Sequence, residues 1–269
     1  MTPASVTLFV KLGPTRVRVR ITGAGDPLLL IMGIGGNVEM WTPLADRLAN
    51  RQLIMFDFPG TGSSGMSWLP PAMGANALLT RSLLRKLGYD RVDVLGYSWG
   101  GILAQQLAIQ HRGTVRKLVL AATSVGLGGI PASPKVTARM LTPRRYYSRS
   151  YFVKIAPETY GGRFRHDEAL ANDEANRRIG RPPGMAGYVA QLLAMAGYST
   201  LPGLPFIAAP TLVLAGADDP VVPLRNQYLM AKLIRHSQLE IVAAAGHLLL
   251  LDSPEIAAPL IDRFLSADE

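Results

Sequence analysis

The stretch V-L-G-Y-S-W-G-G-I-L, residues 94–103, lies between an apolar β-type run and a helix-type run. Ser98 therefore stands in a strand-to-helix turn, with Gly96 before it and Gly100 after it. A G-x-S-x-G pattern is short enough to arise by chance, but in this setting it predicts a nucleophile elbow, a sharp turn that projects the serine Oγ. The alternative interpretation is that Ser98 only caps the helix that follows.

Short apolar runs on both sides of this stretch predict strands at residues 6–10, 17–21, 28–32, 53–57, 92–96, 117–121, 211–215 and 239–243. The alternating run V-R-V-R-I suits an edge strand with one wet face, whereas the later runs suit strands that are covered on both faces. Helices are expected from Thr42-Pro43, with Thr42 as the N-cap, and over residues 101–110, 224–235 and 254–265.

The alternation of strands and helices predicts an α/β fold with a mostly parallel, eight-stranded sheet flanked by helices. It breaks between about residues 125 and 208, where Gly/Pro-rich edges enclose mainly helical sequence. We interpret residues 125–208 as a helical cap or lid inserted into a core formed by residues 1–124 and 209–269.

Composition limits the classes of protein to consider. The chain has 269 residues, 48% of them hydrophobic and 17% charged, which is typical of a globular protein with a sizeable core. The absence of cysteine excludes disulfides and thiolate metal sites and fits the cytoplasm. No apolar run approaches the roughly 18 residues needed to span a bilayer, so no integral membrane association is expected. The N-terminal residues lack the features of a secretory signal.

The net charge of +9 is concentrated in the predicted cap, where eleven Lys and Arg residues outnumber five Asp and Glu residues between Leu127 and Thr200. The arginines there are scattered, which favours a solvated surface; attraction to an anionic surface is the alternative. Nothing resembles a nucleic-acid-binding module, so no nucleic-acid partner is expected.

A serine nucleophile needs a base, and His247 is the best placed of the four histidines. It follows the predicted strand at 239–243, in a loop expected at the carboxyl edge of the sheet beside the elbow. The carboxylate that would orient it comes from G-A-D-D-P, where Asp218 and Asp219 both follow a strand. We favour Asp219, with Asp218 as a turn residue that bonds its own backbone.

An oxyanion formed during acyl transfer would need backbone donors. We predict them to be the N–H groups of Trp99 and of Ile34, the latter in the loop M-G-I-G-G-N, where Gly33 and Gly35 permit close approach. That loop does not match a dinucleotide fingerprint, and D-F-P-G-T-G-S-S at 57–64 is not a phosphate-binding loop but a structural turn. The sequence contains no metal-ligand spacing, and we expect neither a metal nor an organic cofactor.

Besides the elbow, several further segments match those of a known protein family, namely K-L-V-L-A-A-T, P-R-R-Y, I-A-P-E-T-Y-G-G-R-F-R, P-T-L-V-L-A-G-A-D-D-P-V-V-P and G-H-L. With them the chain resembles the α/β-hydrolase superfamily and, within it, intracellular poly(3-hydroxyalkanoate) depolymerases of the medium-chain-length type. The resemblance implies an α/β-hydrolase fold and a cytoplasmic, granule-associated serine hydrolase that cleaves stored polyester. Carried over by position, its triad is Ser98, Asp219 and His247. Met32 departs from the family, which often has a polar residue there.

We predict that Gly33, Gly35, Tyr146 and Tyr188 contact a hydrophobic ester or polyester substrate. The two glycines permit close approach, and the two tyrosines belong to the apolar cap residues that suit aliphatic side chains. One alternative is a small-molecule carboxylesterase or lactonase with the same triad. Another is a non-catalytic granule-associated protein, which the complete set of triad residues disfavours. Dehalogenase and epoxide-hydrolase chemistry is disfavoured because those relatives carry Asp at the position of Ser98.

Overall fold

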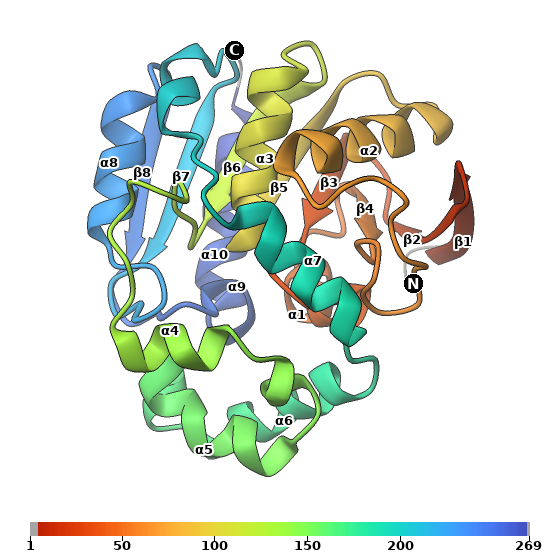
Figure 1. Cartoon of the computed structure of the whole chain (residues 1–269). Helices are drawn as coiled ribbons and strands as arrows, with labels where there is room; N and C mark the ends of the chain where they lie inside the picture. Colours follow the sequence, from red (N-terminus) through yellow and green to blue (C-terminus); the bar gives the residue numbers. More distant parts are fainter. Residues whose placement is uncertain (1–4, 268–269) are drawn as a thin grey trace.

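The computed structural model describes residues 5–267, which form one eight-stranded sheet in the order β1-β2-β4-β3-β5-β6-β7-β8 (Figure 1). The strands are β1 (Ser5–Leu12), β2 (Thr15–Thr22), β3 (Pro27–Ile31), β4 (Gln52–Phe56), β5 (Val92–Tyr97), β6 (Val115–Ala121), β7 (Thr211–Gly216) and β8 (Ser237–Val242). Strand β2 pairs antiparallel with β1 and β4, and all other pairs are parallel. The predicted α/β class with a mostly parallel sheet is therefore confirmed.

Each apolar run that predicted a strand lies largely within one, but two expectations about edges were wrong. The run V-R-V-R-I belongs to β2, which is hydrogen-bonded on both sides, and β1 is the edge instead. Arg18, the first arginine of this run, is buried although it is charged, because it pairs with the carboxylates of Glu39 and Asp57. At the other side β8 is an edge strand and is only partly buried, whereas β5 and β7 are buried along their whole length.

The helices of the core are α1 (Thr42–Ala45), α2 (Met73–Lys86), α3 (Trp99–Gln110), α8 (Arg225–Leu233), α9 (Leu249–Asp252) and α10 (Pro254–Ser266). Helices α2 and α3 pack together on one face of the sheet, and α1 and α10 cover the other (Figure 1). Helix α2 was missed by the sequence analysis. Thr42 is not the N-cap of α1 but its first residue, because a 3-10 turn, η1 (Val38–Trp41), precedes it.

Between β6 and β7 the chain forms the cap helices α4 (Pro134–Met140), α5 (Arg149–Tyr160), α6 (Glu168–Ile179) and α7 (Met185–Met195), with 3-10 turns η2 (Pro143–Tyr146), η3 (Gly162–Arg165) and η4 (Leu201–Phe206). Ser133, Ser148 and Asp167 cap α4, α5 and α6 by accepting backbone N–H bonds, which explains where these helices begin. The cap lies across the carboxyl ends of the strands (Figure 1). None of the described helices combines the length and apolarity that a bilayer crossing requires.

Most of the cap arginines interact within the protein instead of forming a free cationic surface. Carboxylates pair with Arg139, Arg163, Arg165, Arg177, Arg178 and Arg181. Arg145 is buried without such a pair, and Arg144 lies over the ring of Tyr151. The excess charge of the cap is thus largely committed to internal contacts.

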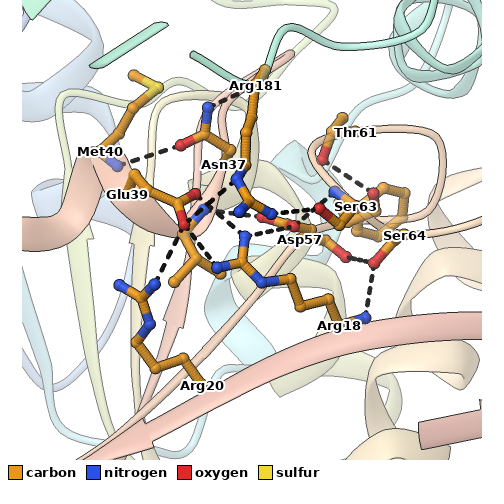
Figure 2. A network of polar contacts seen from close by, with 12 residues as sticks. Arg18, Arg20, Asn37, Glu39, Met40, Asp57, Thr61, Ser63, Ser64 and Arg181 are labelled. Atoms are coloured by element: carbon orange, nitrogen blue, oxygen red, sulfur yellow. Dashed lines mark hydrogen bonds and ion pairs between the residues drawn. The ribbon is translucent and has the colours of Figure 1, made fainter. Parts of the chain in front are cut away.

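The turn at 57–64 has the structural role that its sequence suggested (Figure 2). Buried Asp57 accepts hydrogen bonds from the N–H groups of Val38 and Ser63, both at 2.8 Å. Burial raises the pKa of Asp57, and these donors together with Arg18 oppose that effect. Arg181 of the cap donates to Ser63 and lies near Glu39, so the same network ties the cap to the core (Figure 2).

Candidate active site

Ser98 occupies a strained turn between β5 and α3, with φ 54° and ψ −122°. Such a backbone conformation costs a non-glycine residue about 1–3 kcal/mol and persists only where the surroundings impose it. The Thr123 hydroxyl donates to the Ser98 carbonyl at 2.7 Å, and a Cβ on Gly100 would lie 2.1 Å from the Ile31 carbonyl oxygen. The Ser98 side chain makes no capping bond to α3, which argues against the capping alternative.

His247 connects Ser98 to Asp219. Its Nε2 lies 3.0 Å from Ser98 Oγ, and its Nδ1 lies 2.9 Å from Asp219 Oδ2. The loop after β8 holds the imidazole in place, because the His247 N–H donates to the Tyr160 carbonyl at 2.7 Å and the Tyr97 hydroxyl donates to the His247 carbonyl at 3.0 Å. In this arrangement a histidine can take the proton of a hydroxyl group while a carboxylate stabilises the imidazolium.

The two adjacent aspartates have different surroundings. Asp219 is buried, and its Oδ1 accepts from the N–H groups of Val221 and Val222, both at 2.8 Å, so that Oδ2 remains for His247. Asp218 points to the cap, where Arg165 donates to both of its oxygens at 2.5 and 2.7 Å. The expectation that Asp218 bonds its own backbone was wrong. The Arg165 guanidinium lowers the pKa of Asp218.

The loop predicted to hold an oxyanion donor is fastened from the cap. The Tyr146 hydroxyl donates to the Ile34 carbonyl, and the Gly35 N–H donates to Gln191 Oε1 at 2.8 Å. Gln191 also accepts from Trp99 Nε1 at 2.9 Å through its carbonyl. These contacts fix the loop beside Ser98, where a Cβ on Gly33 would lie 3.3 Å from Ser98 Cβ. Sequence analysis missed Gln191, because nothing in a helical segment marks one glutamine as a loop anchor.

Two cavities meet at Ser98 and Ile34. The larger, of about 250 Å³, is mainly apolar and is lined by Trp99, Ile102, Leu141, Leu192, Met195 and Val221, among others. The smaller, of about 20 Å³, is lined by His247, Arg145, Arg178, Tyr160, Tyr146 and Gly33, among others. Of the predicted substrate contacts, Gly33 and Tyr146 line the smaller cavity.

Gly35 and Tyr188, the other predicted substrate contacts, line neither of these two cavities. They pack against each other: a Cβ on Gly35, whose φ is +73°, would lie 2.9 Å from the Tyr188 ring. Tyr188 is fully buried and donates its hydroxyl hydrogen bond to the Met140 carbonyl. Their contacts therefore shape the loop and the cap from behind the cavities.

Two buried tyrosines border the imidazole. Tyr160 stacks on His247, with ring centroids 6.3 Å apart and planes at 17°, and Tyr97 lies 5.4 Å away. Burial raises the pKa of Tyr160 and raises that of Tyr97 well above its usual range. Both phenols therefore stay protonated at neutral pH and do not act as bases. The Tyr97 hydroxyl donates to the His247 carbonyl, whereas the buried Tyr160 hydroxyl has no partner among the residues described.

Comparisons with known proteins identify the family of the chain. A family model described as "alpha/beta hydrolase fold" matches residues 26–254. A poly(3-hydroxyalkanoate) depolymerase of Ectopseudomonas oleovorans is 43% identical over 90% of this chain and 85% of that protein. An esterase from Exiguobacterium antarcticum has a TM-score of 0.83 at 22% identity and covers 97% of this chain and 100% of its own.

An enol-lactonase from Burkholderia xenovorans LB400 likewise has a TM-score of 0.83, at 18% identity, and covers 97% of this chain and 100% of its own. At these identities the two solved structures show a shared fold. The family match over most of the chain and the 43% identity to one relative also show which family the chain belongs to. The chain belongs to the α/β-hydrolase fold family and resembles poly(3-hydroxyalkanoate) depolymerase.

Proposed function

We propose that this protein hydrolyses ester bonds of poly(3-hydroxyalkanoate) or its oligomers through an acyl-enzyme formed on Ser98. The chain is a carboxylic ester hydrolase by its family and by its 43% identity to a depolymerase of that polymer. The serine mechanism is supported above all by the hydrogen-bonded series Ser98–His247–Asp219. Asp219 and His247 are buried, and half-buried Ser98 lies where two cavities meet, so that a substrate ester can reach its hydroxyl.

In the proposed mechanism His247 Nε2 removes the proton of Ser98 as Oγ attacks the ester carbonyl. The oxyanion is bound by the N–H groups of Ile34 and Trp99. Trp99 is the first residue of α3, where helix geometry leaves N–H groups without partners in the helix. His247 then gives the proton to the leaving alcohol. A water molecule, activated in the same way, releases the acyl group and restores Ser98.

The large cavity supports an aliphatic substrate. Its apolar lining would remove an alkyl chain from water, which is worth about 0.8 kcal/mol for each buried CH₂ group. A location in the cytoplasm at polyester granules is part of this proposal, because the resemblance implies a stored polymer. Co-sedimentation of the protein with isolated granules would test the location separately from the chemistry.

The first test compares Ser98→Ala with the control Ser150→Ala, an exposed serine of α5. We expect the Ser98 variant to fold normally and to lose p-nitrophenyl octanoate hydrolysis, while the control keeps it. Retained activity in the Ser98 variant would exclude Ser98 as the nucleophile.

The second test compares clearing of a suspension of amorphous medium-chain polyester with turnover of soluble short esters. We expect clearing. Fast turnover of soluble esters without clearing of polymer, and without cleavage of its oligomers, would instead assign the protein as a small-molecule carboxylesterase or lactonase.

A further inference from the structure

The small cavity beside Ser98 contains buried positive charge that the serine mechanism does not use. Arg145 and Arg178 both line it and are only 1% and 2% exposed. Arg178 pairs with Glu174 at 2.8 Å, but the same carboxylate also binds Arg177 at 3.0 Å. No carboxylate among residues 5–267 pairs with Arg145. Glu174 is thus shared by two guanidinium groups, and the guanidinium of Arg145 has no carboxylate of its own.

Arg145 also has hydrogen-bond donors that are not used. Its Nη1 donates to the Thr142 carbonyl at 2.9 Å, whereas its Nε and Nη2 are buried without a well-aligned hydrogen bond, and the Tyr188 hydroxyl interacts with the guanidinium from the side of the cap. The guanidinium carbon lies 4.9 Å from the ring centre of Tyr146 and 5.4 Å from that of Tyr188. Such ring contacts stabilise the charge but accept no conventional N–H hydrogen bond.

A third unpartnered donor lines the same cavity. The Tyr160 hydroxyl is buried and makes no hydrogen bond in the described part of the chain. A buried donor without a partner costs about 1–3 kcal/mol, and a buried unpaired charge costs more. A cationic guanidinium with two poorly satisfied nitrogens and a free phenol hydroxyl together fit a small anion with two acceptor oxygens, such as a carboxylate, and a cavity of about 20 Å³ has room for little more than that group.

The position of His247 indicates which end of a substrate would enter this cavity. His247 lines the small cavity and not the large one, whereas Trp99, the proposed oxyanion donor, lines only the large one. The leaving alcohol oxygen must lie beside His247 Nε2 to receive its proton. This requirement favours a leaving group whose carboxyl end alone enters the small cavity toward Arg145, with the acyl chain in the apolar cavity.

We propose that the small cavity binds the free carboxylate of the leaving 3-hydroxyacid, so that the enzyme prefers chains with a free carboxyl end and releases the terminal unit. This inference rests on the proposed function. In the step, Ser98 Oγ bonds to the ester carbon, the bond from that carbon to the alkoxy oxygen breaks, and His247 protonates this oxygen. The terminal 3-hydroxyacid leaves with its carboxylate unchanged, and water then cleaves the acyl-enzyme to release the rest of the chain as a second acid.

The test measures kcat/KM of the wild-type protein for the dimer of 3-hydroxydecanoate as the free acid and as its methyl ester, with p-nitrophenyl octanoate as a third substrate. We expect the free acid to be preferred by about 10-fold or more, since a hydrogen-bonded ion pair is lost in the methyl ester. Equal values for the two dimers would overturn the inference and leave the proposed function intact. If neither dimer is cleaved while the p-nitrophenyl ester is, the proposed function itself fails.

Two variants locate the preference. Arg145→Met removes the unpaired guanidinium, and Arg144→Met removes the same charge from its exposed neighbour. We expect the ratio of free acid to methyl ester to fall toward one in Arg145→Met and to stay as in the wild type in Arg144→Met. A preference that survives in folded Arg145→Met would overturn the assignment to Arg145. If that variant does not fold, the affinities of folded Ser98→Ala for the two dimers are compared instead. We expect tighter binding of the free acid, and equal affinities would overturn the inference.

Discussion

The carboxyl edge of the sheet and the cap contribute to the same site in different ways. Ser98, Asp219 and His247 each follow a strand of the core, and core hydrogen bonds hold Ser98 and Asp219, while the His247 N–H bonds the Tyr160 carbonyl at the end of cap helix α5. The cap supplies Arg145, Tyr146 and Gln191, which line a cavity or hold the loop at Ile34. The core thus carries the reacting groups, and the cap mainly determines what lies around them. Substitutions in the two regions should accordingly change different measured quantities.

The largest effect should come from the core. Asp219→Asn should lower kcat by about 10⁴-fold, because an amide stabilises the wrong imidazole tautomer. Asp218→Asn is the matched control, because the Asp218 carboxylate pairs with Arg165 and not with His247. Steady-state kinetics with a p-nitrophenyl ester measures both variants. A large loss in Asp218→Asn with little loss in Asp219→Asn would reverse the assignment of the adjacent aspartates.

The next effect should be on stability and should come from the cap. Glu174→Gln leaves the buried guanidinium of Arg178 without its carboxylate, and breaking such a pair costs about 3 kcal/mol or more. This corresponds to a decrease in Tm of roughly 6 °C or more. Glu168→Gln, an exposed residue in the first turn of the same helix, should change Tm little. Similar melting curves for both variants would show that the pair is not important for the cap.

A smaller effect should appear in specificity. Leu192→Trp places a larger side chain in the apolar cavity, whereas its neighbour Leu193 is 56% exposed and does not line that cavity. We expect Leu192→Trp to lower kcat/KM for p-nitrophenyl octanoate by roughly 10-fold while the acetate changes little, in line with 1–3 kcal/mol per misfitted methylene. Leu193→Trp should leave the ratio of the two substrates unchanged. An unchanged ratio in Leu192→Trp would place the acyl chain elsewhere.

The smallest effect should depend on pH. Because Arg165 lowers the pKa of Asp218, their ion pair contributes stability above the ordinary carboxyl pKa of 3.8, and this contribution is lost as pH falls through the lower folded value. The pair is about two-fifths exposed, so its contribution should stay below about 1 kcal/mol. Denaturant unfolding of Asp218→Asn should show a small deficit at pH 7 that disappears in strong acid. A deficit that persists in acid would have another cause.

The sequence predicted the parts of the fold that depend on local pattern. Apolar runs marked the strands, and the glycines around Ser98 marked the turn, because a sharp turn packed against β3 excludes side chains. Edge positions were predicted less well: β2 was expected at the edge because its residues alternate, but its arginine is neutralised by Glu39 and Asp57, which are distant in sequence. Helix α2 was missed because only its packing against α3 and β1 shows why it forms.

For the site, strand ends and residue chemistry were enough to select Ser98 and His247, since parallel strands bring their carboxyl ends to one edge. The choice between Asp218 and Asp219 depends on the direction of each side chain, which adjacent residues in a turn do not reveal in sequence. Arg145 was counted only as one of several scattered cap arginines, and its burial, free donors and position beside Ser98 became visible only in the folded chain. Local sequence thus determined the proposed reacting groups. The cavities were decided only by the packing of the cap on the core, because the walls of each cavity combine segments that are far apart in the chain.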